Sequence, residues 1–320
     1  MASQKTALIT GISGQDGSYL AELLCGQGYR VLGASHRDSG QMHCGAAVID
    51  IMKLDLADTR AVNEVVATTR PDEIYNLAAR ASSAQLFDDP IQTAEVNGVA
   101  TVRFLEAIRQ FSSATHFCQA ASSEIFAGAK TTPQSETTEI APVNSYGAAK
   151  AYGLHMIRMY RERYGLHAST AILFNHESPR REEHYVTRKI AKAAVMIAAG
   201  KSDELELGNL DSRRDWGYAG DYVNAIWRMS QYAVGDDYVI ATGETHSVRD
   251  FCKIAFEYVG LNYNDYVKVN KSFGGRIDTV ELRGNPGRAE QQLGWRRSVD
   301  FPGLVKMLVD ADRDRLKKAE

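Results

Sequence analysis

The chain has 320 residues, of which 24% are charged, and a formal net charge of −3. This near balance of charge argues against a surface dedicated to nucleic acid or to an anionic membrane, and we expect neither as a partner. The length allows one large domain or two ordinary ones. No apolar run reaches the ~18 residues that a membrane-spanning helix needs, and the four cysteines lack metal-ligand spacing. We therefore expect a cytoplasmic protein with reduced thiols and no metal site.

Strand-like and helix-like stretches alternate through the first half of the chain. The expected strands are Lys5–Thr10, Tyr29–Ala34, Val48–Leu54, Glu73–Ala78, His116–Ala121 and Ala168–Phe174. The expected helices between them are Gln15–Gln27, Thr59–Thr69, Gln92–Phe111 and Tyr146–Tyr164. This alternation predicts an α/β fold, a Rossmann-type doubly wound parallel sheet with helices on both faces.

The pattern loosens beyond Asn175, where we expect helices at Val186–Ala199, Gly220–Tyr232, Val248–Val259 and Phe301–Lys318. No low-complexity linker separates the two halves, so we expect two intimately joined domains. Residues 1–175 would form the dinucleotide-binding domain, with returning segments near 215–245. Residues 176–320 would form most of a smaller, discontinuous substrate domain at the C-terminal end.

A glycine-rich turn directly follows the first expected strand and opens the first helix. Its glycines have GxxGxxG spacing. Such glycines permit a tight turn, let the backbone approach a pyrophosphate and let the helix pack on the strand, while the helix N-terminus offers N–H groups to the anion. The alternative is a purely structural turn, but the position after the first strand favours dinucleotide binding. The expected cofactor contacts here are Gly11, Ser13, Gly14, Gln15, Asp16 and Gly17.

The end of the second strand bears on the choice between NADP and NAD. A carboxylate there would hold the ribose hydroxyls of NAD, whereas an arginine would hold the 2′-phosphate of NADP. Arg37 and Ser39 favour NADP, and the neighbouring Asp38 leaves NAD open. The ends of the next two strands are placed to meet the adenine and to run along the cofactor. The residues concerned are Asp55, Leu56, Leu77, Ala78 and Ala79.

A tyrosine and a lysine four residues apart open the long helix after the fifth strand. This spacing puts Tyr146 and Lys150 on one helix face, where the ammonium would favour the phenolate and lower the tyrosine pKa from about 10. Tyr185 and Lys189 have the same spacing but lie in the looser half of the chain. We therefore assign the catalytic pair to Tyr146 and Lys150.

A polar turn follows the fifth strand, at the edge where open α/β sheets bind their ligands. The Ser122 hydroxyl could share a substrate proton with Tyr146, and the Glu124 carboxylate could act as a second acid or base. The other interpretation is a serine that caps a helix, with its accompanying glutamate.

These motifs occur together with others that are typical of one enzyme family. The segments are TGISGQDGSYLAELL, NLAA, the Ser122–Glu124 turn, YGAAK, ILFNHESPRR, VTRKI, LGNLDSRRDWGYAGDYV and RGNP. In them the chain resembles the GDP-mannose 4,6-dehydratases of the extended short-chain dehydrogenase/reductase family, and the resemblance runs over nearly the whole chain.

The resemblance implies a lyase that works through an internal redox cycle. Tyr146 takes the proton from O4 of the sugar while a hydride leaves C4 for the nicotinamide. Glu124 removes H5 and assists the loss of water from C6, and the hydride returns to C6. The product is a 4-keto-6-deoxy sugar nucleotide, and the cofactor is regenerated.

The resemblance also implies binding roles. Further cofactor contacts would come from Lys150, His176 and Arg181. The GDP-sugar would meet Ser123, Asn175, Val186, Lys189, Gly208, Asn209, Arg214, Arg276 and Glu281. The two arginines would pair with the diphosphate, because their planar fork suits phosphate oxygens, and Glu281 would lie near guanine.

The chain departs from the family pattern at four places. Ser122 stands for the usual threonine. The family usually has two adjacent arginines after the second strand, and here Asp38 replaces the second of them in a shorter loop. In the family this loop binds the 2′-phosphate and helps to join dimers into tetramers, so the departure argues against both NADP preference and a tetramer. The segments 80–85 and 276–281 differ where relatives border the sugar and the nucleotide. These last two changes suggest a sugar different from that of GDP-mannose. The substrate would then be a GDP-manno-heptose or another GDP-hexose.

Two other functions stay open. A nucleotide-sugar 4-reductase or epimerase would use the same fold, but Glu124 favours the dehydratase because simple epimerisation needs no base at C5. A catalytically silent dinucleotide sensor would predict a broken tyrosine–lysine pair, which the chain does not have. By resemblance, the helices Gln92–Phe111 and Tyr146–Tyr164 would form the interface of a homodimer, or of a dimer within a homotetramer.

Overall fold

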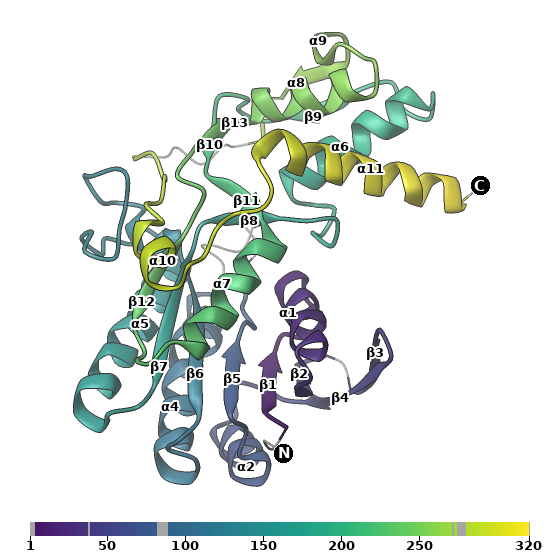
Figure 1. Ribbon diagram of the computed structural model, residues 1–320. Coiled ribbons are helices and arrows are strands. Elements are labelled where there is room, and N and C mark those ends of the chain that lie inside the picture. The colour runs from purple at the N-terminus through teal and green to yellow at the C-terminus, as the bar shows by residue number, and fades with distance from the viewer. Residues whose placement is uncertain (1–3, 38, 82–88, 271, 274–279, 320) are drawn as a thin grey trace.

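An eight-stranded sheet forms the centre of the molecule, in the order β12-β7-β6-β5-β1-β2-β4-β3 (Figure 1). The computed structural model describes residues 4–37, 39–81, 89–270, 272–273 and 280–319. Neighbouring strands pair in parallel except β3 and β4, which are antiparallel at one edge. The strands are β1 (Thr6–Thr10), β2 (Arg30–Ser35), β3 (Gly40–Cys44), β4 (Ala47–Lys53), β5 (Glu73–Asn76), β6 (His116–Ser122), β7 (Ala168–Leu173) and β12 (Asp237–Ile240).

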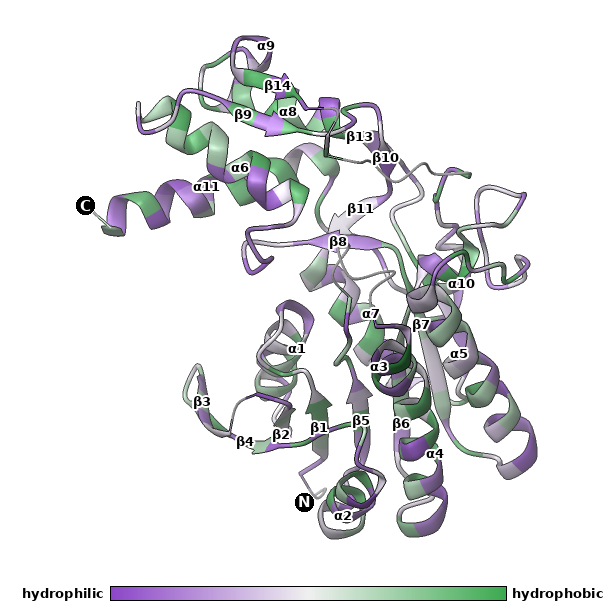
Figure 2. Cartoon of the chain, turned by 180° about the vertical axis from the view of Figure 1, so that it is seen from behind, coloured by the Kyte–Doolittle hydropathy of each residue, from purple (hydrophilic) through white to green (hydrophobic). Residues whose placement is uncertain are grey.

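Helices cover both faces of this sheet, and each face has its own apolar core. The helices α1 (Gln15–Gly26) and α7 (Ala219–Gln231) pack together on one face. The helices α2 (Thr59–Thr69), α4 (Ala100–Phe111) and α5 (Ser145–Tyr164) cover the other, where α4 and α5 lie side by side (Figure 2). The central strands β1, β5 and β7 are therefore buried almost throughout, as parallel strands between two helical layers are. The predicted doubly wound α/β fold is confirmed.

A second lobe lies beyond the carboxyl ends of the strands (Figure 1). Its apolar core packs α6 (Val186–Ala198), α8 (Val248–Tyr258) and α11 (Phe301–Ala319) against β9 (Leu205–Leu207) and the short helix α9 (Tyr263–Tyr266). The strand β14 (Val267–Val269) pairs with β9, and the helix α10 (Gly287–Gln292) packs beside β12. The strand β12 belongs to the main sheet and α7 covers one of its faces, although both follow α6 in the chain.

Two small sheets join the lobes. The strands β8 (Asn175–Glu177) and β11 (Trp216–Tyr218) pair in parallel, while β10 (Arg213–Arg214) and β13 (His246–Ser247) pair antiparallel. The pairing of β8 with β11 makes the segments 175–181 and 208–222, which carry two of the motifs described above, neighbours in space.

The predicted helix Gln92–Phe111 is interrupted by a wider turn. It consists of α3 (Pro90–Ala94), a π-helical turn η2 (Glu95–Val99) and α4. In the turn, the Asn97 side chain accepts from the Arg80 N–H at 2.9 Å and donates to the Arg80 carbonyl at 3.1 Å. Gly98 faces α5 so closely that a Cβ there would lie 3.0 Å from the Ala149 carbonyl oxygen. A π-helical turn contains one residue more than an α-helical turn. The apolar spacing of this segment gives no sign of that residue, so the sequence predicted one uninterrupted helix.

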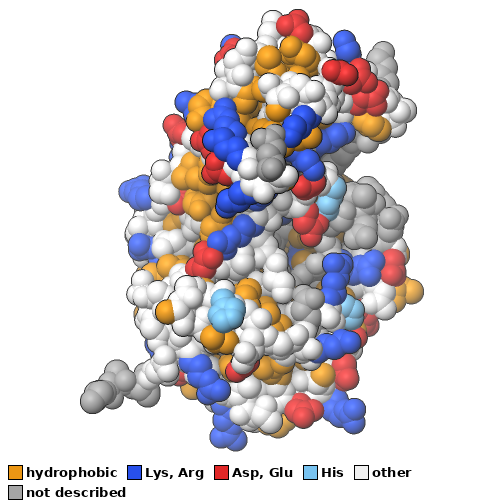
Figure 3. All heavy atoms as spheres, turned by 90° about the vertical axis from the view of Figure 1, so that its right-hand side faces the viewer, with side chains coloured by type: hydrophobic (Ala, Val, Ile, Leu, Met, Phe, Trp, Pro, Cys, Tyr) orange, Lys and Arg blue, Asp and Glu red, His pale blue; other side chains and the backbone are white. Residues whose placement is uncertain are grey.

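Charges of both signs share the surface of the molecule. On the face shown in Figure 3, Lys and Arg side chains are interspersed with Asp and Glu. None of the helices in the described ranges is long and apolar enough to cross a membrane. Among the same residues, no three His, Cys, Asp or Glu side chains gather in a way that could hold a metal ion.

Candidate active site

A cavity of about 930 Å³ lies where the carboxyl ends of β6 and β7 meet the second lobe. Residues from both halves of the chain line it. The predicted site residues in this lining are Asp16, Leu77, Ala79, Ser122, Ser123, Glu124, Tyr146, Lys150, Asn175, His176, Arg181, Val186, Lys189, Gly208, Asn209 and Arg214. The fold thus brings together side chains that are up to about 200 positions apart, as an open α/β sheet does at its ligand-binding edge.

The helix that carries the catalytic pair begins beside the end of β6. The Asn144 side chain caps it by accepting from the Gly147 N–H at 2.8 Å. Tyr146 and Lys150 follow on one face, and both are buried. Lys150 Nζ donates to the Ala120 carbonyl at 2.7 Å and lies 5.7 Å from the centre of the Tyr146 ring. Burial lowers the pKa of Lys150 to about 8.

The tyrosine differs from the prediction. Burial raises the pKa of Tyr146 above its ordinary value, a hydrogen bond with Ser122 lowers it in part, and the negative charge of Glu124 raises it again. The predicted lowering by Lys150 is wrong here, because burial dominates and the ammonium is directed at the Ala120 carbonyl. The phenol is therefore protonated at neutral pH unless a further positive charge lies next to it.

The polar turn after β6 is a short 3₁₀ turn, η3 (Ser123–Phe126). The Ser122 hydroxyl caps it by accepting from the Glu124 N–H at 3.3 Å. The Glu124 carboxylate accepts from the Asn144 Nδ2 amide at 2.8 Å, so the helix cap of α5 also orients this carboxylate. Ser122 therefore caps a helical turn, and both Ser122 and Glu124 line the cavity. The capping interpretation and the catalytic interpretation of this turn do not exclude one another.

The glycine loop after β1 has the geometry of an anion cradle. Gly11 has φ +68°, and a Cβ on it would lie 2.9 Å from the Ala78 backbone. A Cβ on Gly17 would lie 2.3 Å from the Gly11 carbonyl oxygen, so the helix packs on the loop only without a side chain there. No side chain caps α1 at Gly14. The first turn of α1 therefore leaves room for a pyrophosphate.

An ion pair fixes the start of α1 to the joint between the lobes. Asp16 Oδ2 and His176 Nε2 are 2.8 Å apart. The Gln15 side chain donates to the His176 carbonyl and accepts from the Ser178 hydroxyl. Burial would raise the pKa of Asp16, but the charge and hydrogen bond of His176 hold it below its ordinary value. Burial would lower the pKa of His176, and Asp16 raises it instead. The pairing neutralises the carboxylate that would otherwise repel an anion at this helix end.

Arg181 adds a permanent positive charge to this lining, close enough to Asp16 to lower the pKa of that carboxyl. Its guanidinium stacks 3.5 Å from the centre of the Tyr185 ring, and Nε lies 3.3 Å from the Glu177 carboxylate. That Nε is buried and has no hydrogen-bond partner among the residues that the structure describes. Together, the glycine cradle and this cation fit a dinucleotide with a pyrophosphate.

The predicted adenine and ribose contacts lie at the ends of β2 and β4, outside the cavity lining. Arg37 is exposed just past β2, and Asp55 is exposed past β4 with Oδ1 accepting from the Ala57 N–H at 2.9 Å. Leu56 is buried, and its carbonyl accepts from Arg103 at 3.0 Å. Since β2 and β4 are neighbours in the sheet, these positions are close to one another.

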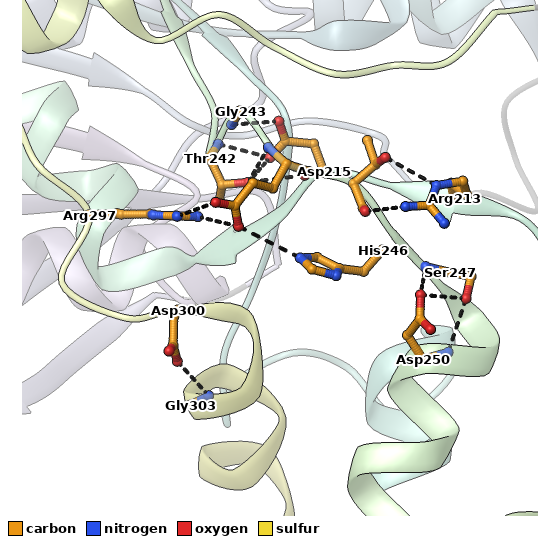
Figure 4. A network of polar contacts seen from close by, with 12 residues as sticks. Arg213, Asp215, Thr242, Gly243, His246, Ser247, Asp250, Arg297, Asp300 and Gly303 are labelled. Atoms are coloured by element: carbon orange, nitrogen blue, oxygen red, sulfur yellow. Dashed lines mark hydrogen bonds and ion pairs between the residues drawn. The ribbon is translucent and has the colours of Figure 1, made fainter.

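The segment that carries Arg214 is held by a buried carboxylate. Asp215 accepts from the Thr242 N–H at 2.8 Å, the Thr242 hydroxyl at 2.6 Å and the Gly243 N–H at 3.1 Å (Figure 4). It also accepts from the Gly284 N–H at 3.1 Å. Burial raises the pKa of Asp215 to about 6, although these donors lower it. One side chain thus ties three distant segments together directly behind the cavity.

Two predicted substrate contacts have other partners in the structure. Lys189 Nζ donates to the Glu206 carbonyl at 2.7 Å and lies 5.1 Å from the centre of the Phe273 ring. Glu281 accepts from the Thr245 hydroxyl, lies 3.7 Å from Arg213 Nε and is not part of the cavity lining. Arg276 lies outside the described residues, as do Asp38 and the departures at 82–85.

Several lining residues were not predicted as site residues. Tyr185 lines the cavity from the start of α6, and its hydroxyl donates to the Ala81 carbonyl at 3.2 Å. Its YxxxK spacing was visible in the sequence, but only the fold shows that both such pairs face one cavity. Phe273 also lines it, and no sequence signal marks this residue.

Comparison with known proteins identifies close relatives. The sequence model of the family described as GDP-mannose 4,6 dehydratase matches residues 8–308. GDP-mannose 4,6 dehydratase 1 of Arabidopsis thaliana is 43% identical over 98% of this chain and 91% of its own length. GDP-mannose 4,6-dehydratase of Sinorhizobium fredii (strain HH103) is 40% identical over 99% of each chain.

Solved structures share the fold. UDP-glucose 4-epimerase of Thermotoga maritima, determined with UDP-glucose, superposes with a TM-score of 0.85 at 22% identity, covering 97% of this chain and 99% of that one. UDP-glucose 4-epimerase of Thermus thermophilus, in complex with NAD, gives 0.82 at 25% identity over 96% and 99%. RMD of Pseudomonas aeruginosa, complexed with NADPH, gives 0.81 at 18% identity over 98% of each chain. Among these structures, the Thermus thermophilus protein was determined with NAD and the Pseudomonas aeruginosa protein with NADPH.

Proposed function

The chain belongs to the GDP-mannose 4,6-dehydratase family, and from this premise we propose that it converts a GDP-sugar into its 4-keto-6-deoxy derivative with loss of water. The observation that carries the proposal is one cavity edge on which the Tyr146 phenol, the Ser122 hydroxyl and the Glu124 carboxylate lie together. Oxidation of a sugar hydroxyl needs a proton acceptor beside it, which is the role of the phenol. Removal of a proton from the next carbon needs a second base nearby, which is the role of the carboxylate.

The residues divide the proton transfers between them. Tyr146 accepts the proton from O4 of the sugar, and its hydrogen bond with Ser122 orients the phenolic oxygen. Glu124, oriented by Asn144, removes the proton from C5 once C4 is a ketone, and its proton then leaves with the C6 hydroxyl as water. When bound, a nicotinamide would supply the hydride acceptor for C4 and the hydride donor for C6, and its positive charge would favour the phenolate. C5 would then take up one proton, which balances the proton that Tyr146 removed from O4. The sum is the loss of one water with no net oxidation.

A nicotinamide dinucleotide would be held by residues from both lobes. The glycine loop would take the pyrophosphate, Lys150 the nicotinamide ribose, and Arg181 a phosphate or the carboxamide end. For the ribose at the adenine end we propose NADP, because Arg37 is exposed directly after β2. Replacing Arg37 with Ala should weaken NADP+ binding about tenfold or more, since a charge-assisted phosphate contact is lost, and should leave NAD+ binding within about twofold. Titration calorimetry with both dinucleotides checks this, and equal weakening of both would refute the phosphate role.

For the GDP-sugar we propose that Arg214 meets the diphosphate and that Gly208, Asn209 and Val186 line the nucleotide side. We assign Asn175 and Ser123, which belong to the same lining, to the sugar. The Arg214 assignment is supported by the four hydrogen bonds that anchor the adjacent Asp215. The names of the relatives favour GDP-mannose, and a GDP-manno-heptose is the second candidate.

A homodimer through α3, α4 and α5 is part of the proposal. Ile91 of α3 is 74% exposed, and Tyr152 and Met159 of α5 are 45% and 50% exposed. Tyr152 and Met159 are seven residues apart, so they share one face of α5. Since α3 packs against α5, these exposed apolar side chains lie on neighbouring helices of one layer, where a subunit contact would bury them.

Product analysis tests the function. The purified protein would be incubated with GDP-mannose and, separately, with a GDP-manno-heptose, without added reductant. We expect one of them to give a 4-keto-6-deoxy product by NMR with no net change in NADPH absorbance. Turnover only when NADPH and a keto sugar are supplied would instead establish the reductase, and interconversion at C4 without dehydration would establish the epimerase.

A further inference from the structure

A continuous chain of buried hydrogen bonds runs from the cofactor loop to the catalytic lysine. At its start, the Thr10 hydroxyl at the end of β1 accepts from the Ala78 N–H at 3.1 Å and donates to Asn76 Oδ1 at 2.6 Å. Asn76 Nδ2 donates to Gln119 Oε1 at 2.7 Å, across the pair β5–β6. Gln119 Nε2 donates to the Ala120 carbonyl at 2.9 Å.

The last acceptor in this chain is the one that holds Lys150. The Ala120 carbonyl accepts from Gln119 Nε2 at 2.9 Å and from Lys150 Nζ at 2.7 Å. A carbonyl oxygen has two lone pairs, so these two donors saturate it. Thr101 of α4 adds a second donor to Gln119 Oε1, at 2.9 Å.

Burial makes this arrangement specific. Thr10, Asn76, Thr101, Gln119 and Lys150 are each at most 2% exposed. None of them has a buried polar atom without a partner. In such surroundings an unmade hydrogen bond costs the full desolvation of the group, so each amide has one favourable orientation. The direction of donation is therefore the same along the whole chain, from Thr10 to the Ala120 carbonyl.

We propose that Gln119 is a positioning residue for the dehydratase reaction: through the Ala120 carbonyl it fixes Lys150 relative to the glycine loop. The inference rests on the proposed function and adds a residue that does not itself line the cavity. On one side Gln119 is linked through Asn76 and Thr10 to Ala78, whose backbone is so close to Gly11 that a Cβ there would lie 2.9 Å from it. On the other side it donates to the acceptor of the catalytic ammonium. Movement of either end would have to break a buried hydrogen bond.

Gln119→Glu is the informative variant. A buried carboxyl is protonated near pH 6, where it offers the same acceptor and donor as the amide, and it loses the donor when it ionises. We expect kcat within about threefold of wild type at pH 6 and a fall of about tenfold relative to wild type by pH 8.5, with KM for the GDP-sugar changed less than about threefold. Thr101→Val, which removes one donor to Gln119, should lower kcat by a smaller factor without the new pH dependence.

A second readout does not depend on turnover. Gln119→Leu leaves the Ala120 carbonyl to Lys150 alone, and a stronger hydrogen bond to the charged form favours it. The Lys150 pKa, followed by NMR of lysine labelled with 13C at the ε carbon, should therefore rise from the wild-type value of about 8. Should Gln119→Leu not fold, Thr101→Val and Gln119→Glu carry the same measurement.

Thr115→Val is the matched control. Thr115 precedes β6 at its opposite end, is buried and donates to the Pro71 carbonyl at 2.6 Å. Its loss should lower the unfolding temperature but leave kcat, its pH profile and the Lys150 pKa unchanged. The inference is overturned if the wild type forms product while both Gln119 variants and Thr101→Val match it in all three quantities. Failure of the proposed function is a different outcome, in which wild type itself forms no dehydrated product while the Lys150 titration still responds to Gln119.

Discussion

At the scale of single residues, the site depends on two buried groups whose ionisation the fold changes in opposite directions. Burial raises the pKa of Tyr146 and lowers that of Lys150 to about 8. Both shifts favour the uncharged forms, so the pair alone does not create a phenolate. The charge that does so has to arrive with the bound molecules, which restricts proton abstraction to the loaded site.

Tyr146→Phe removes the proposed acceptor of the O4 proton and keeps the ring. We expect kcat to fall by about 10³, the middle of the range for a lost general acid–base group, while the affinity for GDP stays within about twofold. Steady-state kinetics and calorimetry measure the two. Tyr258→Phe, which removes only a hydroxyl bonded to Asp310 in the second lobe, is the control and should leave both unchanged. A Tyr146→Phe enzyme with kcat near wild type would contradict the assignment.

Lys150→Met should make the protein inactive and more stable. The unfolded chain holds the Lys150 proton up to about pH 10.5, the folded protein only to about 8, so the buried lysine costs stability at neutral pH and the free energy of unfolding rises with pH between these values. Removing the group should raise the free energy of unfolding at pH 7 by about 1–3 kcal/mol. The Ala120 carbonyl keeps Gln119 as its donor.

Urea unfolding at pH 7 and pH 10 measures this difference, which should shrink at the higher pH. Lys130→Met, at an exposed position, is the control and should change neither value. A less stable Lys150→Met protein at pH 7 would mean that the hydrogen bond of the ammonium outweighs the cost of its burial.

At the scale of elements, α1 and β8 are coupled by the Asp16–His176 pair. His176 has a raised pKa, so its contribution to stability is complete below about pH 6.5 and is lost as the pH rises through the raised value. Asp16 has a lowered pKa, so its contribution is complete above about pH 4 and is lost as the pH falls through the lowered value. The pair is therefore strongest between about pH 4 and 6.5.

Asp16→Asn should lower the free energy of unfolding most within this range. We expect a loss of about 1–3 kcal/mol at pH 5.5 and a smaller one at pH 9, because the neutral histidine then makes an ordinary hydrogen bond. Thermal unfolding at the two pH values checks this. The control is Glu22→Gln, which breaks an exposed ion pair between α1 and Arg180. An equal loss at both pH values would show that charge on His176 is not involved.

Most helices and strands of the main sheet could be predicted from the sequence. The main strands and helices were predicted within one or two residues, because buried parallel strands are apolar runs and their helices have regular apolar spacing. The strand β3 was missed because its residues are mostly exposed, and β12 because a four-residue run in a loosely patterned region gives little signal.

The candidate site was predictable where a motif follows a strand. Gly11 directly follows β1 and Ser122 ends β6, so the parallel sheet places both at its ligand-binding edge. Tyr146 was recognised instead by its spacing to Lys150 at the start of α5. The Gln119 network and Phe273 were not predictable, because their partners lie on elements that only the fold makes adjacent. The direction in which the Tyr146 pKa is shifted was predicted wrongly for the same reason, since burial is a property of the whole site.

At the scale of the whole molecule, the exposed apolar row on α3 and α5 predicts a dimer. Met159→Glu would place a charge in that row, and we expect it to convert the dimer to monomers in sedimentation equilibrium while the unfolding temperature changes little. Val234→Glu, at a position 62% exposed just after α7, is the control and should leave the dimer intact. A wild-type monomer at micromolar concentration would contradict the assignment of this face.

The most direct test of the account follows a single hydrogen atom. GDP-mannose, or the GDP-manno-heptose if that is the substrate, would be prepared with deuterium at C4 and converted by the purified protein in ordinary water. The internal redox cycle predicts that the 4-keto-6-deoxy product carries this deuterium at C6, with a solvent hydrogen at C5. A dehydrated product without deuterium at C6, or recovery of the label at C4 of an epimer, would contradict the central claim that this one cavity oxidises, dehydrates and reduces the same sugar.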